Sequence, residues 1–86
     1  MQKIYKYTLD KPIQDIQMPE DALVLSVQMQ HGKPRLWATV DPEVPLVNRR
    51  FVTLGTGHEM PEKELQYCGT VQMFEGSLVF HIFEVL

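Results

Sequence analysis

Cysteine is nearly absent from this sequence, and the one residue, Cys68, has no partner for an internal disulfide. Long apolar runs are also missing, since none approaches the roughly 20 residues that span a bilayer. The first residues lack the apolar core and the small-residue cleavage site of a signal peptide. These absences predict a soluble protein in a reducing cytoplasm, with no membrane partner.

An excess of positive charge is missing too. Eight Lys and Arg residues against eleven Asp and Glu residues give a net charge of −3. The field of the whole molecule therefore does not favour nucleic acid. An anion site in this chain would depend on a local cluster of donors.

No window places apolar residues at a sustained helical spacing of 3.6, and the period is two almost throughout. With 86 residues, 44% of them apolar and 22% charged, the chain is expected to fold as one domain over residues 1–86. We predict an all-β fold, a small antiparallel sandwich or open barrel of about six strands. At most one or two short helical turns are expected, at residues 19–21 and 61–65, where proline precedes acidic residues.

Two hairpins supply four of these strands. One joins residues 23–30 to 33–40 through His31-Gly32, and the other joins residues 67–74 to 77–85 through Glu75-Gly76. Counting outward from the first turn pairs Met29 with Pro34, Val27 with Leu36, Leu25 with Ala38 and Leu23 with Val40. Counting from the second turn pairs Met73 with Leu78, Val71 with Phe80, Gly69 with Ile82, Gln72 with Val79, Thr70 with His81 and Cys68 with Phe83.

The second hairpin is apolar on both faces, so we expect it to be central or covered on both sides. Residues 4–9 and 50–54 also alternate and predict two further strands. A short additional piece could form around residues 15–18. Six prolines lie mostly at the breaks between these segments.

The segment RRFVTLGTGHEM, residues 49–60, is the first candidate for a site. Alternation sends Arg49 and Arg50 to opposite faces of their strand, so only one of them can share a face with Val52. Glycines at 55 and 57 free the backbone to turn its N–H groups toward an anion, with Thr56 and His58 as further donors. The segment lacks the lysine and the following helix of a P-loop, so two hypotheses remain: a plain β-turn, or an anion-binding loop of Arg50, Gly55, Thr56, Gly57 and His58.

Trp37 is the second candidate. The predicted register sets it opposite Ser26 on the polar face of the first hairpin, beside Arg35. One interpretation is a second small core beneath the 41–49 loop. The other is a stacking platform for a base or a partner side chain, with Arg35 as its charge complement.

No other residues predict chemistry. His31 lies in a turn and His81 lies between apolar strand residues, and no spacing among His58, Cys68 and His81 resembles a metal-ligand motif. Cys68 has no positioned base in the sequence pattern. We therefore expect no catalytic residues, no metal and no cofactor, and a protein that is not an enzyme.

Four segments together resemble a known family: residues 4–7, 25–37, 50–58 and 69–84, which include LSVQMQHGKPRLW and RFVTLGTGH. The chain is similar over nearly its whole length to small, functionally uncharacterised proteins of phage and bacterial genomes. No activity and no site residues come with this resemblance. It implies a short accessory protein of phage or prophage origin, acting in the cytoplasm of the bacterial host.

The leading hypothesis is a non-catalytic binding protein, an anti-defence factor that binds or sequesters a nucleotide-like anion at residues 55–58. A domain of this size has little room for a deep pocket, so the site is expected at the interface of a homo-oligomer. One alternative is a protein-binding inhibitor of a host enzyme, which would use a strand edge or the Trp37 face. Another is a small structural or assembly subunit in which residues 55–58 are only a turn.

Overall fold

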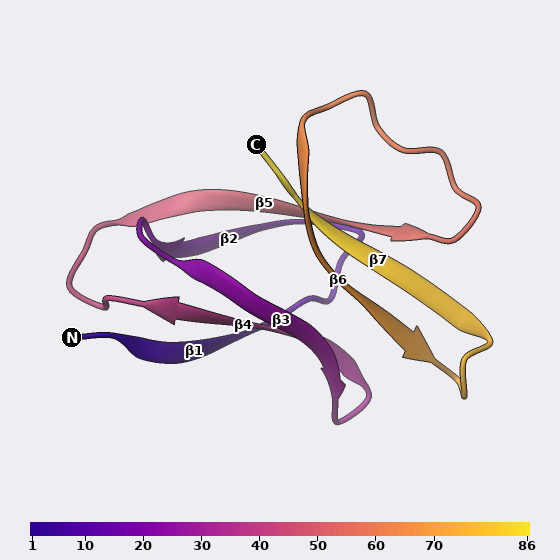
Figure 1. Ribbon diagram of the computed structural model, residues 1–86, viewed down its shortest axis with the longest axis horizontal. Coiled ribbons are helices and arrows are strands. Elements are labelled where there is room, and N and C mark those ends of the chain that lie inside the picture. Colours follow the sequence, from indigo (N-terminus) through magenta and orange to yellow (C-terminus); the bar gives the residue numbers. More distant parts are fainter.

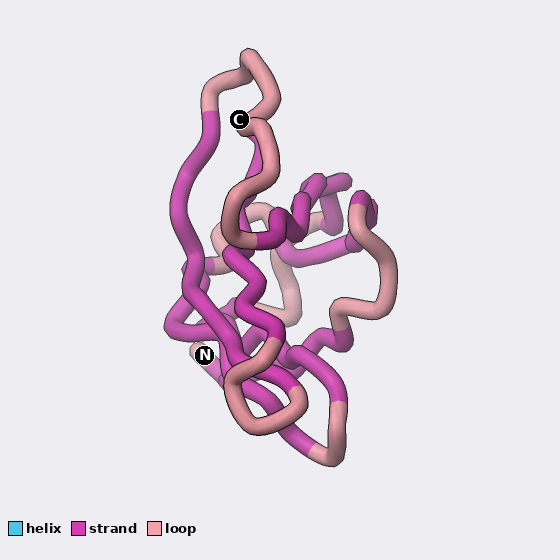
Figure 2. The backbone as a smooth tube through the Cα atoms, turned by 90° about the vertical axis from the view of Figure 1, so that its right-hand side faces the viewer, coloured by secondary structure: helices cyan, strands magenta, loops and turns pink.

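The computed structural model describes residues 1–86 and contains seven β-strands and no helix (Figures 1 and 2). The strands are β1 (Lys3–Thr8), β2 (Ile13–Pro19), β3 (Leu23–Gln30), β4 (Lys33–Val40), β5 (Leu46–Gly55), β6 (Leu65–Met73) and β7 (Leu78–Val85). They form a three-stranded sheet in the order β1-β4-β3 and a four-stranded sheet in the order β2-β5-β7-β6. Every pairing is antiparallel. No helix in the structure could cross a membrane.

The two sheets pack as an open sandwich and do not close into a barrel, which confirms the predicted all-β class. Figure 1 shows the three-stranded sheet at the lower left, with β2 and β5 of the four-stranded sheet above it and β6 and β7 slanting to the right. Seven strands form rather than about six, because residues 13–19 pair with β5 along their whole length. Residues 19–21 make a β-turn, with the Ala22 N–H donating to the Pro19 carbonyl at 2.9 Å, and not a helical turn. Residues 62–63 form a bend and Leu65 begins strand β6, so the predicted helical turn at residues 61–65 does not form.

The core lies between the sheets and comes from the alternate residues that point inward. Met18 of β2, Ile82 of β7 and three residues of β4 have no exposed surface; the three are Leu36, Ala38 and Val40. Phe51 of β5 is 1% exposed. The strict alternation of β4 follows from its place at the centre of its sheet, with one face against the other sheet.

The first hairpin has the predicted register only near its turn. Met29 pairs with Pro34 and Val27 with Leu36, but a β-bulge shifts the register between Val24 and Ser26. Beyond the bulge, Val24 pairs with Ala38 and Leu23 with Thr39. The predicted pairs of Leu25 with Ala38 and of Leu23 with Val40 are therefore wrong. An extra residue reverses the face of every side chain beyond it, and Leu23 and Leu25 are 64% and 50% exposed.

The second hairpin also follows the prediction until a bulge intervenes. All five predicted pairs from Met73–Leu78 to Gly69–Ile82 form, but Tyr67 replaces Cys68 as the partner of Phe83. The loop is longer than the two residues predicted, since β6 ends before Phe74 and β7 begins at Leu78. Phe74 and Glu75 lie in this loop with positive φ angles of 51° and 55°. Strand β7 is central, as expected. Strand β6 is an edge strand whose outer face is open, so coverage on both sides is wrong for it.

The sheets approach most closely where β3 packs against β6. A Cβ atom placed on Gly69 would lie 3.1 Å from the Cβ of Val27. Glycine is thus favoured at position 69 by the short distance between two strands, and not by its own backbone angles. At the other side of the sandwich, the segment from Leu9 to Pro12 crosses from one sheet to the other.

Candidate functional site

Residues 55–58 form a β-turn that continues strand β5. The His58 N–H donates to the Gly55 carbonyl at 3.1 Å, and the Thr56 N–H donates to the Val79 carbonyl of β7 at 3.2 Å. Gly57 has a φ of 91°, a backbone conformation that other residues rarely adopt. The local structure is therefore a turn, but its two ends face a cavity.

This cavity, called the end cavity below, has a volume of about 600 Å³, is open to solvent, and is lined by residues of both sheets at one end of the sandwich. Its walls come from the Leu9–Pro12 crossover, the turn between β3 and β4, the 55–58 turn and the inner faces of β6 and β7. Three of its apolar wall residues are Leu9, Met73 and Phe80. The ionisable residues that line it are Asp10, Lys11, Lys33 and His58.

The crossover that carries Lys11 is fixed to both sheets. The Leu9 N–H donates to the Pro34 carbonyl of β4 at 3.0 Å, and the Thr53 N–H of β5 donates to the Pro12 carbonyl at 2.8 Å. These bonds hold the wall of the end cavity in place.

The half-buried Gln14 side chain supports the same segment. Its Oε1 accepts the N–H groups of Asp10 and Lys11 at 2.9 and 3.3 Å, and its Nε2 donates to the Thr8 carbonyl at 2.9 Å. The backbone around Lys11 is therefore formed before any ligand arrives.

His58 lies at the rim of the end cavity, with its ring folded over Gly55. A Cβ atom on Gly55 would lie 2.8 Å from the His58 Cε1. Any larger residue at position 55 would displace the ring, so the first glycine of the segment makes room for the histidine. Thr56, between them, turns the other way and contacts His81 on the outer face of the four-stranded sheet, with 2.7 Å between its Oγ1 and the ring Nε2.

Arg50 does not reach the end cavity. It points to the outer face of the four-stranded sheet, where its Nε and Nη2 donate to the Asp15 carboxylate at 2.7 and 3.1 Å. The hydrogen bond from Arg50 lowers the pKa of Asp15. Both side chains are nearly half exposed. Arg50 lines a second cavity of about 430 Å³ beside Val52 and Met60.

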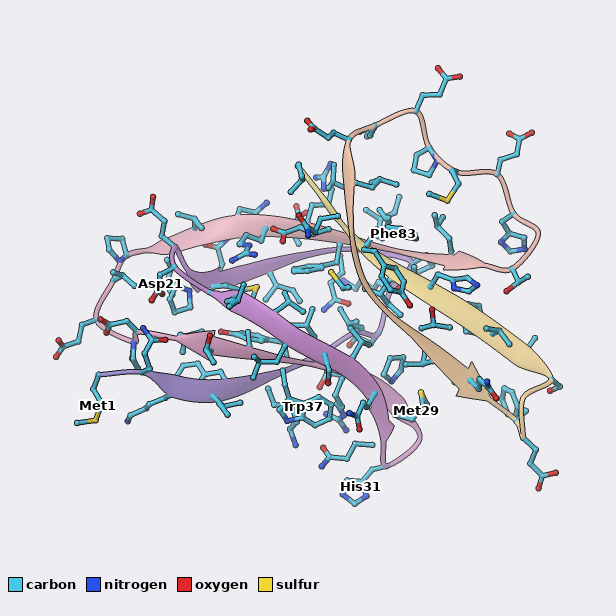
Figure 3. The ribbon with its side chains drawn as sticks, viewed as in Figure 1. Met1, Asp21, Met29, His31, Trp37 and Phe83 are labelled. Carbon is cyan, nitrogen blue, oxygen red and sulfur yellow. The ribbon has the colours of Figure 1, made fainter.

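Arg35 and Trp37 lie on the outer face of the three-stranded sheet, away from residues 55–58. Arg35 donates to the Thr8 Oγ1 at 2.5 Å and to the Gln30 carbonyl at 3.4 Å. Trp37 is half-buried between Lys6 of β1 and Ser26 of β3. Figure 3 shows Trp37 beside the three-stranded sheet, well apart from Phe83 on β7. Of the seven candidate residues, only Gly55 and His58 line the end cavity.

Arg49 points inward, opposite to Arg50, as the alternation predicts. Its Nε and Nη2 donate to the Glu84 carboxylate at 2.6 and 2.7 Å, and its Nη1 donates to the Ala22 carbonyl at 2.6 Å. The bond to Glu84 raises the pKa of Arg49. The pair lies at a third cavity of about 430 Å³, on which Cys68 also borders.

Cys68 is a neutral thiol at physiological pH. Burial is the main cause that raises its pKa to about 11, and the nearby Glu84 charge adds to the effect. Because the thiolate is the reactive form, a raised pKa argues against a nucleophilic role.

The sequence did not single out Lys11, Lys33, Gln14 or His81. Lys11 lies in a loop and Lys33 begins strand β4, far apart along the chain, and each has a proline beside it as its only local signal. The predicted register pairs His81 with Thr70, as the structure confirms, but the sequence does not predict the contact of His81 with Thr56. Only the crossover between the sheets brings the lysines to the same opening.

No curated protein and no solved structure matches this chain. One family model matches residues 1–86, and it is described as a domain of unknown function, DUF7352. The match confirms the expected relationship to an uncharacterised family. Because this match covers residues 1–86, the chain belongs to the DUF7352 family.

Proposed function

We propose that this protein is a non-catalytic binding protein that takes a small organic anion into the end cavity. The observation that carries the proposal is the pairing of apolar walls with Lys11, Lys33 and His58 at one preformed opening. Ligand sites are typically concave and mostly apolar, with a few polar groups that fix orientation.

The charge at the opening differs from the charge of the whole chain. The chain carries a net −3, yet two lysines and a histidine line the cavity beside one acidic residue, Asp10. A unit-charge pair about 4 Å apart gains about 4 kcal/mol at an effective dielectric constant of about 20. Solvent exposure and salt reduce such a contribution to about 1 kcal/mol or less per lysine. Each lysine would therefore contribute about threefold to fivefold in affinity.

The apolar walls favour an anion with an apolar or aromatic body over a bare inorganic ion. The cavity volume of about 600 Å³ falls within the range of about 300–1,000 Å³ for small-molecule sites. The Phe80 ring supplies a surface on which a planar base can stack. A nucleotide satisfies both requirements, since it joins a planar base to a phosphate.

The proposal keeps the context implied by the sequence resemblance, an accessory factor of phage or prophage origin that sequesters a small signal of its host. The end cavity lies within one chain, so the proposal does not depend on a homo-oligomer. The homo-oligomer stays a prediction.

The test is a calorimetric or NMR titration with AMP, adenosine and inorganic phosphate. AMP is expected to bind more tightly than either fragment. The double substitution Lys11→Met and Lys33→Met should weaken AMP binding by about tenfold or more. Lys3→Met, which removes an exposed lysine of β1 outside the cavity, serves as the matched control and should change nothing. Failure of a panel of nucleotides to shift any cavity resonance would refute the proposal.

A second candidate is binding of a protein partner through the outer face of the three-stranded sheet. Ile4 and Leu23 flank Thr39 on this face and are 62% and 64% exposed, with Trp37 beside them. Apolar side chains gathered on one exposed face mark interaction sites in soluble proteins. Stoichiometric binding that is lost on Trp37→Ala, and kept in the double lysine variant, would favour this candidate over the first.

A further inference from the structure

A chain of hydrogen bonds runs across the outer face of the four-stranded sheet to the 55–58 turn. The Tyr67 hydroxyl lies 2.5 Å from the Thr70 Oγ1, which lies 3.0 Å from the His81 Nδ1. The other ring nitrogen, Nε2, lies 2.7 Å from the Thr56 Oγ1. His81 thus links strand β6 to the turn that follows β5.

Both ring nitrogens of His81 have hydroxyl partners, so two hydrogen bonds fix the orientation of the ring. A neutral imidazole donates from one nitrogen and accepts at the other, whereas a hydroxyl can do either. Thr70 and Thr56 can therefore satisfy both tautomers by rotating their hydroxyl hydrogens. The ring is held at two points whichever nitrogen carries the proton.

The turn itself has few other attachments. Pairing between β5 and β7 ends at Gly55, opposite Phe80. Beyond that pair, the Thr56 N–H bond to the Val79 carbonyl is the one backbone link from the turn to β7. The Thr56 hydroxyl is exposed, and it gains its short contact only with His81, since its oxygen lies 3.4 Å from the Val79 carbonyl.

Thr56 lies between the two residues of the turn that line the end cavity, Gly55 and His58. Holding Thr56 toward His81 on the outer face therefore leaves the His58 ring on the cavity side, folded over Gly55. If Thr56 were released, the turn could rotate about the flexible Gly57 and carry the ring away from the rim.

We propose that His81 is a positioning residue that holds the 55–58 turn through Thr56 and so keeps His58 at the rim of the end cavity. Its effect on ligand affinity rests on the proposed function, but its effect on the turn does not. When only a fraction of the molecules is competent to bind, the apparent affinity falls by that fraction. Losing one hydrogen bond of ordinary strength corresponds to about threefold to tenfold in that population.

The test uses the full chain without ligand. The His58 Cε1 lies beside Gly55, so the wild type should show a nuclear Overhauser effect between the His58 Hε1 and the Gly55 Hα protons. Thr56→Val removes the hydroxyl at constant shape, and His81→Phe removes the ring nitrogens but keeps a ring. Both variants should lose most of this signal while unfolding as cooperatively as the wild type. Thr56→Ser, which restores the hydroxyl, should keep it.

An unchanged His58–Gly55 signal in both Thr56→Val and His81→Phe would overturn the positioning role. AMP titrations of the same variants then separate the two proposals. Weakening by about threefold to tenfold in Thr56→Val, with recovery in Thr56→Ser, supports both. Loss of the signal in variants of a protein that binds no nucleotide supports the positioning role and refutes the proposed function.

Discussion

The Arg49 guanidinium and the Glu84 carboxylate form a two-pronged ion pair between the sheets, with nitrogen–oxygen distances of 2.6 and 2.7 Å. Their side chains are only 17% and 11% exposed. Glu84→Gln should therefore lower the free energy of unfolding by about 2–3 kcal/mol, because it leaves the Arg49 charge without its counterion. Urea unfolding followed by circular dichroism measures this loss.

The double variant Arg49→Met and Glu84→Leu is the control for this pair. Replacing a buried ion pair by apolar side chains of similar size is often neutral, so the double variant should be more stable than Glu84→Gln. A double variant whose destabilisation equals the sum of the two single changes would show that the side chains are not coupled.

A side chain at position 69 should destabilise the fold, because Val27 must move slightly to make room for it. Gly69→Ala sets a new methyl group 3.1 Å from the Val27 Cβ, and relieving this overlap should cost about 1 kcal/mol. The same substitution in a Val27→Ala background should cost less, because the Val27 Cγ2 contact at 3.4 Å is gone and the smaller alanine has more room to shift its Cβ away. Thermal unfolding of the four proteins measures the coupling, and equal losses in both backgrounds would contradict the close approach.

Cys68 should react slowly in the folded protein. Its pKa rises from 9.0 to about 11, so its alkylation at about pH 8 should be roughly a hundredfold slower than that of the urea-unfolded chain. Iodoacetamide labelling followed by mass spectrometry measures the rate. Equal rates in the folded and unfolded chains would contradict the burial of the thiol.

The same shift predicts how stability changes in alkali. The unfolded chain releases the Cys68 proton first, so the stability present below the ordinary pKa of 9.0 should fall as the pH rises toward about 11. The unfolding free energy of Cys68→Ala lacks this contribution. Subtracting the pH dependence of the Cys68→Ala unfolding free energy from that of the wild type removes the contribution of the lysines and tyrosines that titrate in the same range. If the remaining free-energy difference does not change with pH over this range, the raised pKa of Cys68 is contradicted.

Trp37 fluorescence should separate the two candidate surfaces. No tryptophan lines the end cavity, and Trp37 lies on the outer face of the three-stranded sheet. AMP binding should leave its emission maximum unchanged, and Trp37→Phe should bind AMP as tightly as the wild type. A blue shift on addition of AMP would move the binding site to the three-stranded sheet.

The amino-acid sequence by itself determined the all-β class and the register close to each hairpin turn. The alternation of residues 33–40 specifies which side chains of β4 point inward. The short turn after Gln30 specifies which residues of β3 pair with them near the turn. Both signals are local, because side-chain direction depends on strand period and register depends on loop length. The same alternation places Arg49 and Arg50 on opposite faces of β5, whatever their partners are.

At the two β-bulges the observed register departs from the one that turn length predicts. Leu25 and Cys68 lie outside the regular pairing of β3 and β6, the strands that pack against each other across the sandwich. The apolar residues Leu23, Leu25 and Val27 alternate without a break through the first bulge, so the extra residue leaves no trace in the sequence pattern. The faces of Leu23 and Tyr67 were therefore decided by the way the sheets meet.

Which residues line the candidate site depends on the tertiary structure alone. Lys11 lies in the connection after β1, Lys33 is the first residue of β4, and His58 lies in the turn after β5. They share an opening only because the Leu9–Pro12 crossover bridges the two sheets there. Arg35, Trp37 and Arg50 had the right chemistry for an anion site, yet packing sends them to outer faces. The sequence supplied the GTGH turn through its glycines, whereas its contacts with the end cavity and with His81 depend on residues that only folding brings together.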